Sequence, residues 1–198
     1  MILFKLMTIT NEIFINVGGK MVKYILEEPK RKCLVEHIKK DTTPYFFIRT
    51  IKNPTEAEQL ASVTRNGYSI QFIKNPSEAV QLAAVSQNCD SIQFIKEPSE
   101  KAQLAAVIRY SENIKYIKNP SEKAQLAAVN KNGFNIKYID DPLEKVQIAA
   151  VNKYGDSIKY IKDPSEKVQL ASVNKNEDNI EYIKNPSEAV QKLCPKYY

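Results

Sequence analysis

The chain has 198 residues, a formal net charge of +6 and the composition of a soluble protein. Its length is enough for one substantial core. No apolar run approaches the ~20 residues of a membrane span, so we expect no membrane association. Three widely spaced cysteines, Cys33, Cys89 and Cys194, predict reduced thiols and a cytoplasmic location.

Residues 1–20 form a separate N-terminal segment, because they match no later part of the chain. The apolar run Ile13 to Ile15 predicts a short strand. A competing hypothesis is that translation begins at Met21, with the preceding codons containing a ribosome-binding sequence read in frame. In that case residues 1–20 are not part of the native protein.

Residues 21–53 predict a degenerate N-terminal cap repeat. Lys23 to Pro29 is an imperfect copy of Lys115 to Pro120, and stacked arrays need atypical units at their ends. This segment carries a basic patch, interpreted either as a solvated end face or as a binding surface. The patch consists of Lys30, Arg31, Lys32, Lys39 and Lys40.

Residues 54–198 are organised by a proline that recurs every 22 residues, at Pro54, Pro76, Pro98, Pro120, Pro142, Pro164 and Pro186. A period of this size is typical of solenoids. In the repeat around Pro120, Asn119 is the expected N-cap of a helix, Pro120 its first residue and Glu122 the third residue of a capping box. Gly133 is expected to end this helix in a left-handed conformation, and Asn135 to cap a second, shorter helix.

These patterns predict an all-α fold, a right-handed type of α-solenoid built from helix–turn–helix repeats. Six regular repeats and a C-terminal half-repeat then form one continuous domain with the cap, over residues 21–198. A leucine-rich repeat of the same length is the competing interpretation, and the helix-start pattern and the Ala-Ala pair favour helices.

A glutamine recurs on the side of the long helix that faces away from its polar sector. We interpret it as a structural column of buried amides bonded to neighbouring repeats, because an unpaired buried amide would cost about 1–3 kcal/mol. A half-exposed polar residue is the alternative. The column is Gln59, Gln81, Gln103, Gln125, Gln147, Gln169 and Gln191.

Charge and aromatic residues recur in columns that are candidates for partner binding. Residues 54–185 hold 17 basic and 17 acidic residues, so the array itself is neutral. The aromatic column on the short helices either packs between neighbouring helices or contacts a ligand; it comprises Phe72, Phe94, Tyr116, Tyr138, Tyr160 and Tyr182. Lysines beside it are Lys115, Lys137 and Lys159, and a second lysine column on the long helices is Lys101, Lys123, Lys145 and Lys167.

No catalytic, metal or cofactor pattern is found in the sequence. His37 is the only histidine, no Cys-x-x-Cys pair occurs, and no glycine-rich loop could cradle phosphate. We therefore expect a protein that is not an enzyme, has no cofactor and binds no small-molecule substrate.

The pattern Asn-Pro-Ser-Glu-x-x-Gln-Leu-Ala-Ala-Val, followed by Asn-Gly and Ile-Lys-Tyr-Ile, resembles a tandem helical-repeat family of unknown function from phages, giant viruses and bacteria. The resemblance covers residues 54–194 well and implies an α-helical array, often virus-encoded, with no catalytic residues. It adds the expectation of a viral protein that binds a host defence factor. Our first hypothesis is a non-catalytic protein-binding scaffold; the alternatives are a solenoid for RNA or single-stranded DNA, and a structural virion component.

Overall fold

The computed structural model describes residues 12–17, 20–25, 48–49 and 51–198. These divide into two compact units, Met1–Glu97 and Pro98–Tyr198. Contacts in a repeat array run only between neighbours, so a division of this kind falls at a repeat junction. Each unit is described by itself, and the single continuous domain over residues 21–198 stays a prediction.

The first unit begins with an antiparallel hairpin of strands β1 (Glu12–Val17) and β2 (Lys20–Ile25), in which Glu12 pairs with Ile25 and Val17 with Lys20. β1 contains the short strand predicted at Ile13 to Ile15. β2 was not predicted: the sequence assigns Lys23 to Ile25 to the degenerate cap repeat, and in the structure they lie in a strand. Its Val, Tyr and Ile residues favour a strand, and the Gly-Gly pair before Lys20 is a strong hairpin-turn pattern. Most of the predicted cap repeat, including His37 and Cys33, lies outside the described residues.

Two helical repeats follow in the first unit. The long helices are α3 (Glu56–Arg65) and α4 (Glu78–Gln87), and the short ones are the 3₁₀-helices η1 (Gly67–Phe72) and η2 (Cys89–Phe94). α3 packs on α4 and η1 packs on η2. The helical part of the first unit therefore has two layers, one of long helices and one of short helices.

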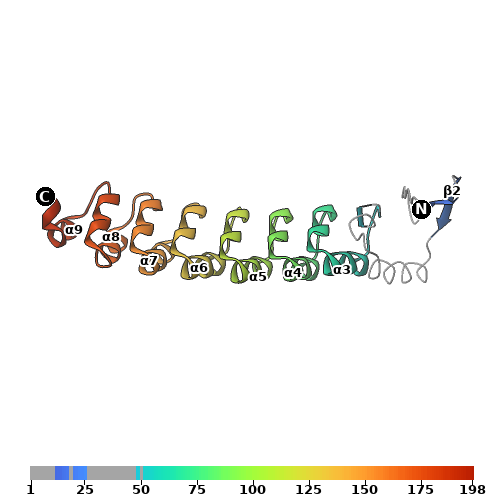
Figure 1. The fold of residues 1–198 in the computed structure, drawn as a ribbon, viewed down its shortest axis with the longest axis horizontal. Coiled ribbons are helices and arrows are strands. Elements are labelled where there is room, and N and C mark those ends of the chain that lie inside the picture. Colours follow the sequence, from blue (N-terminus) through green and yellow to red (C-terminus); the bar gives the residue numbers. More distant parts are fainter. Residues whose placement is uncertain (1–11, 18–19, 26–47, 50) are drawn as a thin grey trace. The chain divides into compact units, whose positions relative to one another are not determined.

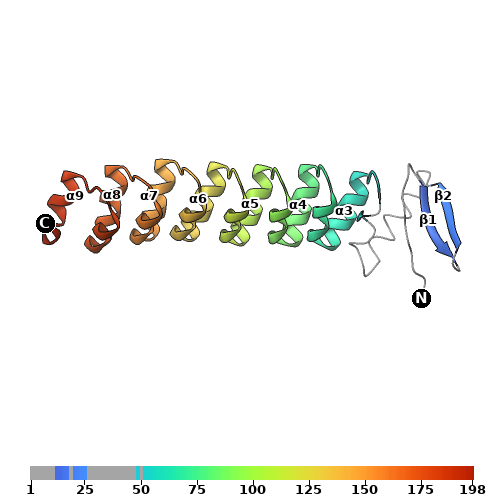
Figure 2. The same cartoon turned by 90° about the horizontal axis from the view of Figure 1, so that it is seen from above.

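The second unit continues the same repeat. Its long helices are α5 (Glu100–Arg109), α6 (Glu122–Lys131), α7 (Glu144–Lys153), α8 (Glu166–Val173) and α9 (Glu188–Leu193). Its 3₁₀-helices are η3 (Ser111–Tyr116), η4 (Gly133–Tyr138), η5 (Gly155–Tyr160), η6 (Glu177–Tyr182) and the terminal η7 (Pro195–Tyr197). Within this unit the long helices lie side by side in one layer and the short helices in another (Figures 1 and 2). The predicted α-solenoid is therefore present in both units.

Small and β-branched residues build the core between the layers. In the repeat that starts at Pro120, Ala124, Ala128, Val129 and Ile136 are at most 1% exposed. Small alanines let neighbouring helices approach closely. Ile136 in η4 and Ile139 directly after it are both buried, so both isoleucines point inward.

The predicted helix starts are wrong by two residues. Ser121, not Asn119, is the N-cap of α6, and its hydroxyl accepts a bond from the Ala124 N–H at 3.3 Å. Ser77, Ser99 and Ser187 cap their helices in the same way. Glu122 is then the first helical residue of α6 rather than the third, so it does not form the predicted capping box. A capping box is present at the start of α3, between Thr55 and Glu58. The later start leaves the proline carbonyl outside the helix, where a side chain can bond to it.

The predicted ends of the helices are also corrected. Asn132, in an extended conformation, ends α6 and caps η4, with its side chain accepting from Phe134 N–H at 3.1 Å. Asn135 is instead buried inside η4 and donates to the Ala128 carbonyl at 3.1 Å. Gly133 has no left-handed backbone; it is needed because a Cβ there would lie 2.5 Å from the Ala150 carbonyl of the next repeat. Left-handed backbone occurs instead at Asp141 (φ 46°) and Asp163 (φ 50°), before the prolines.

Candidate functional site

The candidate site is the exposed side of the 3₁₀-helices in the second unit. We call it the aromatic–lysine face, defined by Tyr116, Tyr138, Tyr160 and Tyr182 with Lys115, Lys137 and Lys159. Each tyrosine ends its 3₁₀-helix, immediately before a buried isoleucine that anchors the chain. Because that isoleucine points inward, the tyrosine ring is turned outward, and Tyr116, Tyr160 and Tyr182 are 41–47% exposed.

Lysine ammonium groups lie between the rings. Lys159 Nζ is 5.2 Å from the ring centroid of Tyr160 and 5.7 Å from that of Tyr182, in the next repeat. Lys137 Nζ is 4.7 Å from Tyr138 and 5.9 Å from Tyr160. Such distances are within the range of cation–π attraction. The lysine heads are thus held over the rings, and the face combines flat apolar surface with positive charge.

Two lysines of the face also have acidic neighbours one 3₁₀ turn away. Lys159 lies 3.3 Å from Asp156, and Lys115 lies 3.9 Å from Glu112. The hydrogen bond to Asp156 raises the pKa of Lys159, so this lysine stays charged throughout the neutral range. At the position that corresponds to Asp156, the repeat of Lys137 has Phe134.

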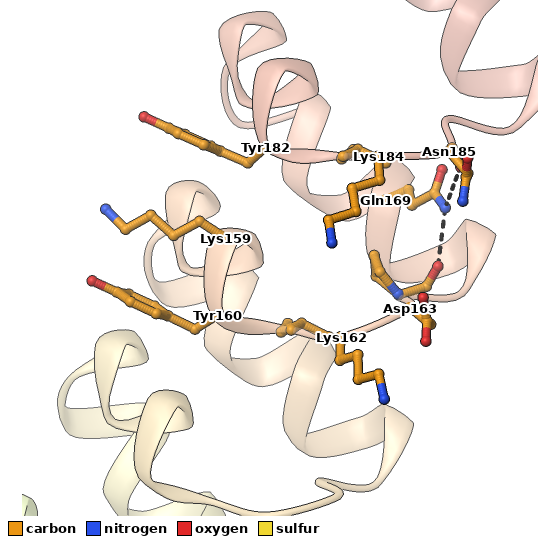
Figure 3. A pocket seen from close by; sticks show the side chains of 11 residues that line it. Lys159, Tyr160, Lys162, Asp163, Gln169, Tyr182, Lys184 and Asn185 are labelled. Carbon is orange, nitrogen blue, oxygen red and sulfur yellow. Dashed lines mark hydrogen bonds between the residues drawn. The ribbon is translucent and has the colours of Figure 1, made fainter.

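A groove of about 430 Å³ lies between the repeats that contain η5 and η6. It is lined by the linkers that follow Tyr160 and Tyr182, which include Lys162, Asp163 and Lys184, and by Lys159. In Figure 3, Tyr160 and Tyr182 extend in the same direction with Lys159 between them, and Gln169 lies at the other end beside Asn185. The groove can therefore hold an extended segment that has both apolar and negative groups.

The glutamine column, of which Gln169 lines this groove, bonds to the proline carbonyls of the repeats. In every repeat from Pro54 on, the glutamine Nε2 donates to the carbonyl of the proline five residues earlier, at 2.8–3.1 Å. Gln103 and Gln169 also accept a bond from the next repeat, from Ser121 N–H at 2.7 Å and Ser187 N–H at 2.9 Å. The predicted bonding to neighbouring repeats is confirmed at these two positions. Gln81, Gln103 and Gln169 are buried, Gln59, Gln125 and Gln147 are half-buried, and Gln191 is exposed.

The lysines of the long-helix column pair with glutamates of the preceding repeat, which sequence reasoning missed. Lys123 bonds Glu100 of the preceding repeat at 2.8 Å, Lys145 bonds Glu122 at 2.6 Å, and Lys167 lies 4.0 Å from Glu144. The hydrogen bond to Glu100 raises the pKa of Lys123. Lys101 also has an interaction partner. The 22-residue period could have revealed this ladder, because each acid precedes its partner by 23 residues.

In the first unit, the corresponding aromatic residues are Phe72 and Phe94, which are 36% and 41% exposed. Tyr68 meets Phe94 edge-on at 5.7 Å, and Arg49 lies 5.9 Å from the ring of Phe72. Each ring therefore packs against a neighbour and still reaches the surface. The five residues of the basic cap patch, Lys30 to Lys40, lie outside the described residues.

Two further contacts were not predicted. Phe134 stacks on Tyr154 of the next repeat, with centroids 5.1 Å apart and planes at 12°. At the C-terminus, Asp178 accepts bonds from Lys196 at 2.8 Å and Tyr197 at 2.6 Å. Both contacts involve residues that differ between repeats or follow the last one, where the period carries no information.

Within the described part of the chain, no cluster of His, Cys, Asp and Glu could hold a metal ion, and no helix is long and apolar enough to cross a membrane. Comparison with protein-family models, curated proteins and solved structures finds no match to the chain.

Proposed function

We propose that the chain is a non-catalytic interaction scaffold that binds an extended segment of a partner protein along the aromatic–lysine face, in the cytoplasm. The observation that supports this most directly is the interleaving of exposed rings and lysines: one ammonium, Lys159, lies within 6 Å of the rings of two successive repeats. Tyrosine offers a large contact area with little conformational entropy to lose, which is why it is enriched at binding surfaces.

The repeat geometry also suits a peptide. Packed helices lie about 8–10 Å apart, and an extended chain advances about 3.3 Å per residue, so about three peptide residues would span one repeat. A segment lying in the groove beside Tyr160 and Tyr182 could place one side chain per repeat against a ring. On the resemblance to virus-encoded arrays, we propose a host protein as the partner.

Single-stranded nucleic acid is the second candidate, because exposed tyrosines with nearby lysines can stack on bases. Carboxylates alternate with the lysines on this face, however, and Asp156 and Glu112 partly neutralise Lys159 and Lys115. A backbone with a phosphate at every nucleotide would meet these acids. A protein segment can place its carboxylates only opposite lysines without such an acid, such as Lys137, whose repeat has Phe134 at the corresponding position, so the charge pattern favours a protein.

The test is a triple charge reversal of Lys115→Glu, Lys137→Glu and Lys159→Glu, with the partner captured from a host extract and identified by mass spectrometry. We expect loss of the captured partner with unchanged helical circular dichroism, since these lysines are exposed. The control reverses Lys101, Lys123, Lys145 and Lys167 on the long helices. Capture that survives the first set and is lost in the control would refute the proposed face; salt-dependent binding of oligo(dT) would instead favour nucleic acid.

A further inference from the structure

The residue that precedes the 3₁₀-helices η3 to η6 of the second unit is of two kinds, asparagine or tyrosine. Asn132 and Asn176 occupy this position before η4 and η6, and each side chain accepts a bond from the N–H two residues later, at 3.1 Å. Tyr110 and Tyr154 occupy it before η3 and η5, which have no side-chain cap. A repeat with tyrosine here has lost a stabilising bond and gained a large ring.

The ring of Tyr154 belongs to a group of side chains that we call the Tyr154 cluster: Phe134, Tyr154, Tyr160, Lys137, Lys153 and Lys159. Tyr154 stacks on Phe134, Phe134 meets Tyr160 edge-on at 6.1 Å, and Lys159 Nζ lies 5.1 Å from Phe134. Lys153 Nζ lies 6.0 Å from the Tyr154 ring. Three rings and three ammonium groups are thus gathered where two repeats meet.

If Phe134 covered the ring of Tyr154, packing alone would explain why a tyrosine occupies this position. Tyr154 remains 43% exposed, however. The stack also needs Phe134, and the other repeats of the second unit have an acid at that position, Glu112, Asp156 or Asp178. Departures from local rules without an evident structural gain are expected at functional sites. Tyrosines at the centre of an interface are also among the most frequent binding hot spots.

The charge of the cluster indicates what it would bind. Of its three ammonium groups, that of Lys159 is paired with the carboxylate of Asp156, whereas Lys137 and Lys153 lie over aromatic rings. A second copy of the chain would bring lysines against lysines in a symmetric interface, where like charges repel.

We propose that the Tyr154 cluster is the anchor point for an acidic protein segment that inserts an aromatic or aliphatic side chain against the exposed surface of Tyr154. Carboxylates on either side of that residue pair with Lys137 and Lys153. The inference rests on the proposed function and narrows it to one place on the face and one class of partner.

The chain itself supplies the variants for a test. Tyr154→Asn introduces the residue that caps η4 and η6, and Phe134→Asp introduces the residue of the two repeats that follow. Both are compatible with the repeat, so folding should be kept. Tyr154→Phe keeps the ring, and Lys123→Gln changes the long-helix edge as a remote control.

The full chain is used to select binders from a random library of displayed 16-residue peptides, and their affinity is measured by fluorescence anisotropy. We expect acidic peptides with an aromatic or aliphatic residue. Tyr154→Asn and Phe134→Asp should weaken them about tenfold or more, with unfolding midpoints close to that of the wild type. Tyr154→Phe and Lys123→Gln should stay within about twofold to threefold of the wild-type affinity.

Selected peptides that are basic, or that keep their affinity for Tyr154→Asn, would overturn the inference. If peptides that overturn the inference nevertheless lose affinity for the triple reversal of Lys115, Lys137 and Lys159, the proposed function stands and only the assignment to the Tyr154 cluster is lost. A library that yields no binder to the face overturns both. Binding of oligo(dT) that Tyr154→Asn abolishes would assign the cluster to nucleic acid and overturn the choice of an acidic protein segment.

Discussion

The amide of Gln103 joins two repeats, and its replacement by leucine should measure the strength of that junction. Gln103 is 7% exposed; its Nε2 donates to the Pro98 carbonyl at 2.9 Å and its Oε1 accepts from Ser121 N–H at 2.7 Å. Leucine is similar in size and can make neither bond. The variant therefore leaves a carbonyl of its own repeat and an N–H of the next repeat without their partner.

Gln125 provides a matched control in the next repeat. Its Nε2 makes the same bond to the Pro120 carbonyl, at 2.9 Å, but its Oε1 is buried with no hydrogen-bond partner. Gln125→Leu thus loses the proline bond and also removes an unsatisfied oxygen. Because the proline bond is common to both variants, their difference contains the loss of the bond between Gln103 and Ser121 together with the removal of the unsatisfied Gln125 oxygen.

We expect Gln103→Leu to lower the free energy of unfolding by about 1–3 kcal/mol more than Gln125→Leu, because the first variant leaves the part-buried Ser121 N–H unpaired and the second removes an acceptor that is already unpaired. At a slope of about 2 kcal/mol/M, this difference moves the urea midpoint down by about 0.5–1.5 M. Urea unfolding followed by circular dichroism at 222 nm measures it, with equal slopes required for the comparison. Equal midpoints for the two variants would show that the amide column does not stabilise the junction.

Three further predictions concern backbone strain, the C-terminus and the ion ladder. Asp163→Ala should destabilise the chain by about 1–2 kcal/mol, because alanine tolerates the left-handed φ of 50° poorly; Asn119→Ala, without such a φ, should cost less than about 0.5 kcal/mol in the same urea assay, and equal losses would refute the strain. The hydrogen bond from Lys196 lowers the pKa of Asp178, so η7 should stay docked at pH 5 and be released only as the pH falls through that lowered value, below the usual ~3.9. The NMR signals of Tyr197 report the release. Asp178→Ala, which removes the acceptor of both bonds, should release η7 even at pH 7, and a variant that behaves like wild type would contradict the contact. Lys145→Gln should leave the thermal midpoint almost unchanged despite its 2.6 Å contact with Glu122, because both side chains are half exposed, and a large loss would show that the ladder stabilises the array.

The sequence is sufficient to predict the repeat and its exposed face, because both depend on periodicity. Buried isoleucines flank each aromatic residue, so their inward direction already turns the ring outward. The amide column follows from the position of the glutamine on the helix and the cost of burying it unpaired. These inferences need only the period and the burial rule.

The helix boundaries cannot be predicted in the same way, since Asn119 and Ser121 are both good N-caps in the same four-residue pattern. The choice depends on a tertiary contact: with the helix starting after Ser121, the Pro120 carbonyl is available to Gln125. The role of the long-helix lysines is hidden for a related reason. Their partners are Glu100, Glu122 and Glu144, which the sequence pattern assigns to capping boxes. That assignment gives no reason to expect these glutamates to form ion pairs with the next repeat.

The repeats also explain how one site can differ from its neighbours without endangering the fold. The stability of a stacked array is approximately a sum over repeats and their junctions. The absence of a side-chain cap on η5 therefore weakens one short helix and leaves the packing of α6, α7 and α8 in place. The lysine–glutamate ladder, by contrast, recurs at successive junctions and cannot distinguish one repeat from the next.

Specific recognition of a partner in a fixed register requires a feature that does not repeat. A tyrosine before the 3₁₀-helix is not enough, because Tyr110 occupies the same position two repeats before Tyr154. The stacked pair of Phe134 and Tyr154 meets the requirement within the second unit, since the position of Phe134 carries an acid in the other repeats there. A partner that reads this pair would therefore bind the array in one register, whereas one that reads only the recurring tyrosines and lysines could slide by a whole repeat.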